Sequence, residues 1–330
     1  MALASAAESD KPAKEIFGAA KLPAVLSARA IGFYSKGCLA GGIAIPTDGP
    51  TWQAMRLSRN RRWGHPDLIA LVERLSREAA AQDGWPGLLV GDISQPRGGP
   101  MLSGHASHQV GLDADVWLTP MPRRTLSARE RETTSAISVL RKNTLHVDPK
   151  IWTPAHARLL MRAASYPQVE RIFVHPGIKK KLCDTWTGNR ASMGKIRPYY
   201  GHHYHFHIRI KCPPGMSGCR SQNPPPAGSG CGKQLAWWFT DEPWAPAKPA
   251  KDTKPKPKKR HIRLTDLPSA CAVVASAPAP ASEREVTLGA DPIARIAAAN
   301  ASNASAAGFA TSSFAPLPAT GPLPQPRPFN

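Results

Sequence analysis

The sequence has no C-x-x-C pair, although it contains six cysteines among its 330 residues. This absence argues against zinc-ribbon and thioredoxin-like folds, which need closely spaced thiolates. An even number of widely separated cysteines is instead typical of disulfide bonds formed in an oxidising compartment. The six residues are Cys38, Cys183, Cys212, Cys219, Cys231 and Cys271.

Long apolar runs are also absent. No stretch approaches the length that crosses a bilayer, which predicts a protein without an integral membrane span. Near the N-terminus, Ala4-Ser5-Ala6 resembles a signal-peptidase site, but no basic and apolar regions precede it. We interpret residues 1–30 as the remnant of an export signal followed by an N-terminal segment.

Acidic residues are few beside basic ones, with 23 Asp and Glu against 43 Lys and Arg and a formal net charge of +20. This charge favours a polyanionic partner such as nucleic acid, an anionic membrane surface or the anionic cell-wall polymer. A nucleic-acid surface needs basic side chains interleaved with aromatic ones, and the Lys-rich segment after Trp244 has no aromatic residue. We therefore expect no nucleic-acid partner.

Composition divides the chain into segments. Residues 31–244 carry the apolar periodicities of a folded domain, with helical spacing over 66–82, 127–143 and 154–165 and strand character over 88–93, 110–117, 169–175 and 204–211. Residues 245–263 alternate Lys, Pro and Ala and are predicted to be a solvated linker. An apolar segment around Cys271 follows at 264–274, and the Ala/Pro-rich residues 275–330 are predicted to be a disordered tail.

Two clusters of histidine stand out. The downstream cluster holds His202, His203, His205 and His207 within six residues. Its strand pattern has a period of two, which places His205 and His207 on one face together with Arg209. Two neighbouring imidazoles on a pleated face supply half of a metal site.

The upstream cluster supplies the other half, with His105, His108, Asp113 and Asp115. Zinc binds His nitrogen and carboxylate oxygen tetrahedrally and keeps one position open in catalytic sites. We predict His108, Asp115 and His207 as the zinc ligands. His205 is placed to carry protons, since hydrolysis also needs a proton shuttle. His202 and His105 are predicted as neighbours that orient ligands or carry protons, and Asp113 as the group that holds a ligand imidazole in the right tautomer.

The motif Ser107-His108-Gln-Val-Gly-Leu-Asp113-Ala-Asp115, together with His202-x-x-His205-x-His207, resembles the penicillin-insensitive murein endopeptidases of the Gram-negative periplasm. This family belongs to the superfamily of lysostaphin-type and D-Ala-D-Ala metallopeptidases. The resemblance runs from about Ser35 to Trp244, so residues 31–244 would be a zinc metallopeptidase domain.

The resemblance implies an α+β fold with a small central antiparallel sheet that carries the zinc site, flanked by helices and long disulfide-tied loops. It implies zinc on His108, Asp115 and His207, and catalytic roles for His205 and His202. The substrate would be peptidoglycan, cut at the D-alanyl to meso-diaminopimelyl cross-bridge. Arg97, in the loop before the first motif, is a further candidate that would pair with a substrate carboxylate.

Two other functions stay open. A D-Ala-D-Ala carboxypeptidase would use the same zinc site, and a non-catalytic wall-binding protein would keep the metal without turnover. Histidines beside a complete ligand set argue against the second alternative, because a binding protein needs no proton shuttle. The oligomeric state is open, with a dimer as one alternative.

The pairing of the cysteines is only partly set by spacing, since six cysteines allow about 15 pairings. Sequence distance selects the short loop between Cys212 and Cys219. The family resemblance implies that Cys183 pairs with Cys231 and Cys38 with Cys271. The last bond would attach the apolar segment 264–274 to the N-terminal part of the domain.

Overall fold

The computed structural model describes residues 11–246 and 260–287. The export-signal site at 4–6, most of the predicted linker and the tail beyond 287 lie outside the described residues. No helix within the described ranges has the length and hydropathy of a transmembrane span.

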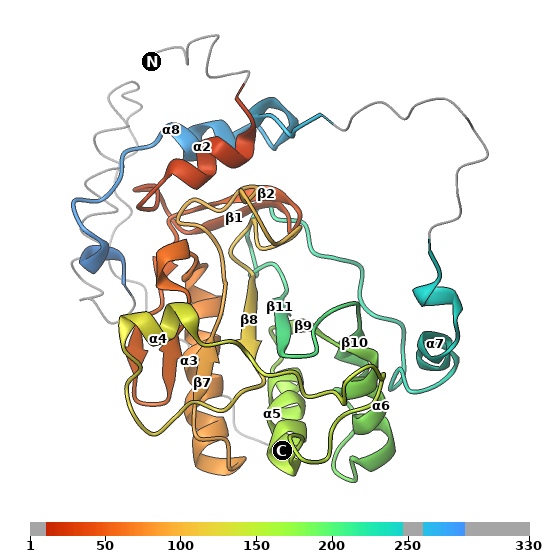
Figure 1. Ribbon diagram of the computed structural model, residues 1–330. Helices are drawn as coiled ribbons and strands as arrows, with labels where there is room; N and C mark the ends of the chain where they lie inside the picture. The colour runs from red at the N-terminus through yellow and green to blue at the C-terminus, as the bar shows by residue number, and fades with distance from the viewer. Residues whose placement is uncertain (1–10, 247–259, 288–330) are drawn as a thin grey trace, which may run out of the picture.

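A mixed sheet forms the centre of the fold (Figure 1). Its seven strands lie in the order β10-β9-β11-β8-β7-β5-β4 within the described residues. Their bounds are β4 Asp48–Gly49, β5 Trp52–Ala54, β7 Leu88–Val90, β8 Asp113–Trp117, β9 Val169–Val174, β10 Ile196–Pro198 and β11 His205–Ile210.

The predicted α+β class is confirmed, but the sheet is larger than expected and is not purely antiparallel. Strand β11 runs antiparallel to both β8 and β9, whereas β5 pairs parallel with β7 and β9 pairs parallel with β10. Parallel neighbours need a crossover connection. Helix α3 (Pro66–Gln82) connects β5 to β7, and helix α6 (Pro176–Thr185) connects β9 to β10. These two crossovers extend an antiparallel centre into a mixed sheet.

The two faces of the central strands differ. Phe206 and Ile208 of β11 and Ala114 and Val116 of β8 belong to the main hydrophobic core, which also takes in the apolar faces of α3 and α5 (Pro154–Ser165). The alternate residues on the same strands are the His and Asp side chains of the two sequence clusters. Because successive side chains of a strand point to opposite sides, one face packs on helices and the other carries the polar site.

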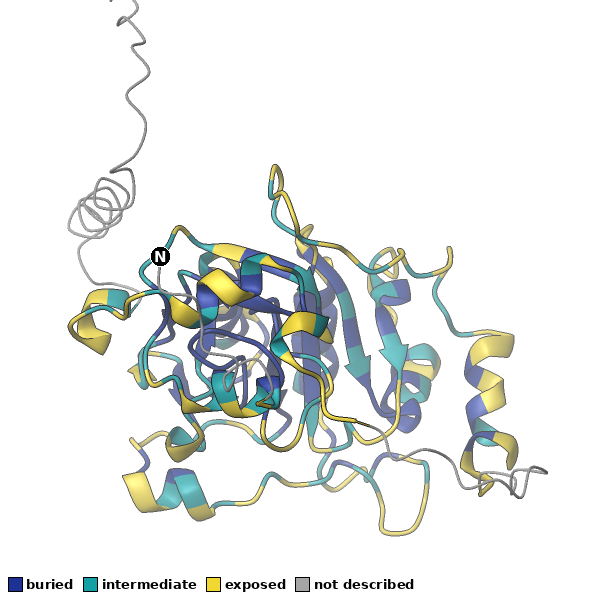
Figure 2. Cartoon of the chain, turned by 90° about the horizontal axis from the view of Figure 1, so that it is seen from above, coloured by how far each residue is buried: buried dark blue, intermediate teal, exposed yellow. Residues whose placement is uncertain are grey.

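Helix α3 shows how local sequence sets these elements. Pro66 occupies its first turn, and Nδ1 of His65 accepts a hydrogen bond from the backbone N–H of Asp67 at 3.2 Å. Both features favour a helix start. The buried side chains of Leu68, Val72 and Leu75 then face the core. Figure 2 shows the same separation elsewhere in the fold, with buried residues along the strands and exposed ones in loops and on outer helix surfaces.

The helix predicted over 127–143 is much shorter in the structure. Helix α4 covers only Ala128–Thr133, although the predicted capping box between Ser127 and Glu130 is present. The guanidinium of Arg56 donates hydrogen bonds to the backbone carbonyls of Arg131, Glu132 and Thr134. A long-range partner therefore satisfies the carbonyl groups at the helix end and lets the chain leave the helix there.

Two small sheets complete the described β structure. Strands β1 (Arg29–Phe33) and β2 (Lys36–Ala40) form a hairpin, and β3 (Ile43–Ala44) pairs with β6 (Trp63–Gly64). Helices α2 (Ala13–Ala19) and α8 (Ala270–Ser276) lie side by side over the hairpin (Figure 1) and share a second hydrophobic cluster with it. The short helix α7 (Lys233–Ala236) begins two residues after Cys231.

Three disulfides join Cys38 to Cys271, Cys183 to Cys231 and Cys212 to Cys219. These are the pairings expected from the sequence and the family resemblance. The first bond holds α8 on the hairpin, where Cys271 and Val274 are buried.

The predicted tail begins later than expected. Residues 275–287, assigned to the disordered tail from composition, are held against the domain. The backbone N–H of Val25 donates to the carbonyl of Pro278 at 2.9 Å, Arg62 pairs with Glu283, and Thr287 forms a β-bridge with Ala44. Composition missed these contacts because their partners are far away in sequence.

The disulfide between Cys38 and Cys271 is expected to contribute more stability than the one between Cys212 and Cys219. The first bond closes a sequence separation of 233 residues and the second only 7, and longer loops lose more entropy when closed. Replacing both residues of the long-range pair by Ser should lower the free energy of unfolding by about 3–5 kcal/mol, measured in denaturant. The matched short-loop double variant should lose less. Equal losses, or free thiols at Cys38 and Cys271 in unreduced protein, would contradict this expectation.

Candidate metal centre

The register between β8 and β11 brings the two sequence clusters together. His207 lies directly opposite Asp115, and Arg209 lies opposite Asp113. Directly opposed residues of an antiparallel pair project their side chains to the same face. The pair His207 and Asp115, which contains two candidate metal ligands, therefore lies next to the pair Arg209 and Asp113 on one face of the sheet.

His108 reaches the same face from the loop before β8. Its backbone has φ 66°, a left-handed conformation that is uncommon for a residue with a side chain. Two buried hydrogen bonds hold it there: its N–H donates to Asp113 Oδ2 at 3.0 Å, and its carbonyl accepts from Ser94 Oγ at 2.5 Å. Strained backbone that the surroundings fix in this way is concentrated at functional sites.

The hydrogen bonds of the two imidazoles determine which nitrogen atoms remain free. His108 Nδ1 donates to the carbonyl of Ile93 at 2.5 Å, and His207 Nε2 donates to Asp113 Oδ1 at 2.9 Å. In neutral imidazole the other nitrogen then carries a lone pair. These are Nε2 of His108 and Nδ1 of His207, which face each other at 3.2 Å.

Asp115 Oδ1 completes a triangle with these two atoms. It lies 3.4 Å from His108 Nε2 and 3.2 Å from His207 Nδ1. It is buried and finds no hydrogen-bond donor among the described residues. Three lone-pair atoms that converge in a buried site form an arrangement that can hold a cation. Ligand atoms of a tetrahedral zinc ion are about 3.3–3.5 Å apart at the usual bond lengths, so the triangle fits such an ion.

Asp113 binds the imidazole of His207 and the backbone of His108, and it is fully buried. It accepts from Arg209 Nε at 2.7 Å as well as from His207 and from the backbone of His108. Burial alone would raise the pKa of Asp113, but the charge of Arg209 and the hydrogen bond from His207 outweigh it and hold the pKa well below the usual range. The carboxylate therefore stays ionised and keeps His207 in the tautomer that leaves Nδ1 free.

His205 and His202 lie beside the triangle without belonging to it. His205 Nε2 is 3.7 Å from Asp115 Oδ2, and the ring centroids of His202 and His205 are 4.8 Å apart. His202 has φ 52° and its Nδ1 donates to the carbonyl of Tyr200 at 2.6 Å. Burial, with the nearby His205 and His207, lowers the pKa of His202 to about 4, so this imidazole is neutral at pH 7.

His105 is the outer neighbour of the triangle. Its Nδ1 lies 3.6 Å from Asp115 Oδ2, and its Nε2 lies 3.0 Å from Asp92 Oδ2. His105, His108 and Asp115 also form a group close enough to hold a metal ion. The two candidate sets share His108 and Asp115 and differ in the third ligand. His207 Nδ1 lies closer to the Asp115 carboxylate than His105 Nδ1 does, at 3.2 Å against 3.6 Å.

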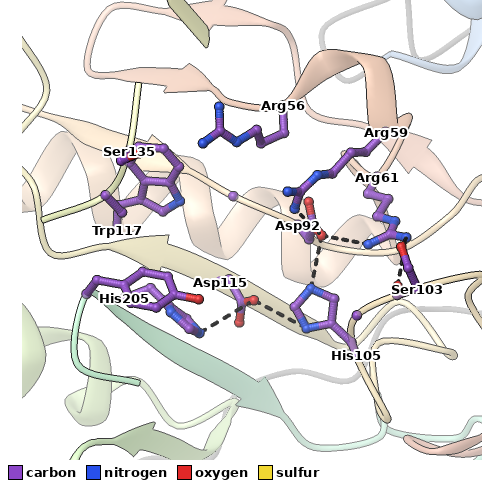
Figure 3. A pocket seen from close by; sticks show the side chains of 14 residues that line it. Arg56, Arg59, Arg61, Asp92, Ser103, His105, Asp115, Trp117, Ser135 and His205 are labelled. Carbon is purple, nitrogen blue, oxygen red and sulfur yellow. Dashed lines mark hydrogen bonds and ion pairs between the residues drawn. The ribbon is translucent and has the colours of Figure 1, made fainter. Parts of the chain in front are cut away.

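A cleft of about 500 Å³ opens over the site (Figure 3). Asp115, His105 and His205 lie on one side of it, and Arg56, Arg59 and Arg61 on the other, with Asp92 between Arg61 and His105. No role at the site was predicted from the sequence for these arginines or for Asp92. The available signal was the run of basic residues from 56 to 62, which includes Arg56, Arg59, Arg61 and Arg62.

The interpretation of Arg97 as a substrate ligand is corrected by the structure. Arg97 is buried away from the cleft, and its guanidinium donates to the backbone carbonyls of Val274 at 2.9 Å and Ala275 at 2.7 Å. Its Nε donates to the carbonyl of Leu22 at 3.3 Å. Arg97 therefore holds the end of α8 on the domain.

Two imidazoles and a carboxylate thus converge, the carboxylate lines an open cleft, and further histidines lie beside it; this set of donors suits a metal ion. Residues 30–276 match the family model described as penicillin-insensitive murein endopeptidase. The chain therefore belongs to the penicillin-insensitive murein endopeptidase family.

Relatives that carry this name confirm the assignment. The protein of Haemophilus influenzae is 45% identical over 228 residues, which are 69% of this chain and 79% of the relative. That of Klebsiella pneumoniae is 38% identical over 229 residues, or 69% and 83% of the two chains. That of Yersinia enterocolitica is 39% identical over 234 residues, or 71% and 84%.

Replacing His108, Asp115 or His207 by Ala is expected to remove most of the bound metal, because each change deletes one of three donors. Metal analysis of dialysed protein checks this. His146→Ala is the matched control, since His146 is exposed and stacks on Phe239 away from the triangle. Full metal content in His207→Ala would show that His207 is not a ligand and would favour His105.

Proposed function

We propose that this protein is a zinc-dependent murein endopeptidase of the periplasm that hydrolyses the D-alanyl to meso-diaminopimelyl cross-bridge of peptidoglycan. The observation that carries the proposal is the triangle of lone-pair atoms from His108, Asp115 and His207, with edges of 3.2–3.4 Å. Family membership and the names of the relatives give the substrate class. Three disulfides support a location outside the cytoplasm.

Zinc fits the donor set better than a hard cation does. Two imidazole nitrogens and one carboxylate oxygen are typical zinc ligands, whereas calcium and magnesium are bound almost entirely by oxygen. When bound, zinc would act as a Lewis acid that makes a water molecule more acidic and polarises the scissile carbonyl.

The protein's own residues supply the proton transfers. His205 borders the cleft, its Nδ1 is buried and finds no partner among the described residues, and burial lowers its pKa. A neutral imidazole in this position can accept a proton from the attacking water. As the water oxygen bonds to the carbonyl carbon and the C–N bond breaks, the same proton can pass to the leaving amine. His202, held by Tyr200, lies behind His205 and orients it.

The ligand geometry also accounts for insensitivity to β-lactams. These drugs acylate a nucleophilic serine, and the proposed reaction uses water in place of a serine. No acyl-enzyme forms, so the drug finds no group to modify. The name of the relatives, penicillin-insensitive murein endopeptidase, states the same property.

Digestion of purified sacculi, with the products identified by mass, tests the function. The proposal predicts conversion of cross-linked dimers to monomers, undiminished by a saturating β-lactam, and no conversion by His207→Ala. Release of free D-Ala from pentapeptides without loss of dimers would instead establish a carboxypeptidase. Binding to sacculi without any product would establish a non-catalytic wall-binding protein.

The proton-transfer role of His205 gives a separate expectation. His205→Ala should keep its zinc while kcat falls by about 10²- to 10⁴-fold, the usual effect of losing a general acid or base. Metal content and steady-state kinetics on cross-linked dimers measure the two quantities. Unchanged turnover in the metal-loaded variant would reduce His205 to a packing role.

A further inference from the structure

The cleft wall opposite the metal centre is built on a strained turn. Residues Leu57–Arg59 form a single 3₁₀ turn, flanked by Arg56 with φ 56° and Asn60 with φ 52°. Left-handed backbone at two residues with side chains is costly and persists only where other contacts fix it. Ser58 supplies such contacts, since its N–H and its hydroxyl both donate to the carboxylate of Glu132 at 2.8 Å. The turn is therefore held rigidly at the edge of the cleft.

Two of the three arginines on this wall are used within the protein. Arg56 donates to three backbone carbonyls at the end of α4. Arg61 has a side chain only 9% exposed, and it donates to Asp92 Oδ2 at 2.9 Å and to the carbonyl of Ser103 at 2.9 Å. In both residues Nη1 and Nη2 already donate to groups of the protein.

Arg59 differs from both. Its side chain is 48% exposed, and its one hydrogen bond to a described residue joins Nη1 to Asp92 Oδ2 at 3.2 Å. A guanidinium has five N–H donors. Nε and Nη2 of Arg59 therefore have no partner among the described residues, and they stand at a cleft that Asp115 and His205 border from the other side (Figure 3).

The charge of the wall is unbalanced. Two carboxylates lie beside the three arginines: Glu132, whose pKa is lowered by its bonds to Ser58 and by Arg56 and Arg59, and Asp92, which also accepts from His105 at 3.0 Å. The other carboxylate among the described residues that line the cleft is Asp115, which belongs to the metal centre. The wall thus carries an excess of positive charge that an anionic ligand would neutralise.

We propose that Arg59 binds the carboxylate next to the scissile amide nitrogen of the cross-bridge. This assignment rests on the proposed function. In a D-alanyl to meso-diaminopimelyl link, the amide nitrogen is attached to a carbon that itself carries a carboxylate. A guanidinium with two free donor groups suits a carboxylate through paired hydrogen bonds. Arg59 thus makes the enzyme specific for cross-bridges in which this carboxylate is free and not amidated.

A pair of cross-linked dimers that differ only in this carboxylate, free or amidated, tests the assignment. The wild-type enzyme should show a kcat/KM about 10- to 100-fold higher on the free acid, the usual effect of a hydrogen bond to a charged group. Arg59→Gln should lose this preference, falling on the free acid and staying within about threefold on the amide. Arg59→Lys should be intermediate, because it keeps the charge and loses the paired donors.

Arg77→Gln is the matched control, because Arg77 is an exposed arginine of α3 whose charge pairs with Glu73 on the same helix. It should retain the full preference. If Arg59→Gln lowers kcat/KM equally on both dimers, Arg59 acts structurally through Asp92 and the assignment is overturned. Equal kcat/KM of the wild-type enzyme on the free acid and the amide would also overturn it. A wild-type enzyme that cleaves neither dimer would overturn the proposed function together with this assignment.

Discussion

The charge of one buried carboxylate, Asp113, supports the arrangement of the whole centre. It lies on β8, its principal partners Arg209 and His207 lie on β11, and it also binds the backbone of His108 in the preceding loop. A buried charge without partners would be strongly unfavourable, so these contacts form together or not at all. Asp113 therefore determines three features of the site: the position of the loop, the tautomer of His207 and the pairing of the two strands.

The ion pairs of Asp113 explain how a group of charged and polar side chains can lie on the buried face of a sheet. All five residues of β8 are buried, including both aspartates. Such a strand would be unstable if its polar face had no compensating charges. Arg209 neutralises Asp113 and packs over the ring of Tyr34, with its Cζ atom 4.0 Å from the ring centroid. Asp115 has no arginine or lysine partner among the described residues, and only histidines surround it, so a bound cation would balance its charge.

Much of the site could be predicted from the sequence, because it depends on local patterns. A period of two placed His205, His207 and Arg209 on one face, and the spacing of His108 and Asp115 suited a loop that enters a strand. The ligand set of His108, Asp115 and His207 followed from the complementary donor types of the two clusters, and the resemblance to a known family implied the same set. The disulfide between Cys38 and Cys271 likewise followed from the resemblance, since spacing alone left the alternatives open.

The errors all involve partners that are distant in sequence. Residues 134–143 have helical composition, yet Arg56 captures the carbonyls at the end of α4. Arg97 was interpreted as a substrate ligand because it precedes the first motif, but the carbonyls of α8 reach it only after the chain has folded back. The mixed sheet arises from two crossover helices, whose effect on strand order has no local signal. Arg59 was missed for the same reason, since its turn comes to the cleft through contacts with residue 132.

Anomalous X-ray scattering from crystals of zinc-loaded protein, measured at the zinc absorption edge, locates the metal without reference to activity. We expect one strong peak within bonding distance of His108 Nε2, Asp115 Oδ1 and His207 Nδ1, with His207 Nε2 still donating to Asp113. A peak bonded to His105 in place of His207 would contradict the ligand assignment. The absence of any peak at the triangle in fully active protein would contradict the whole account.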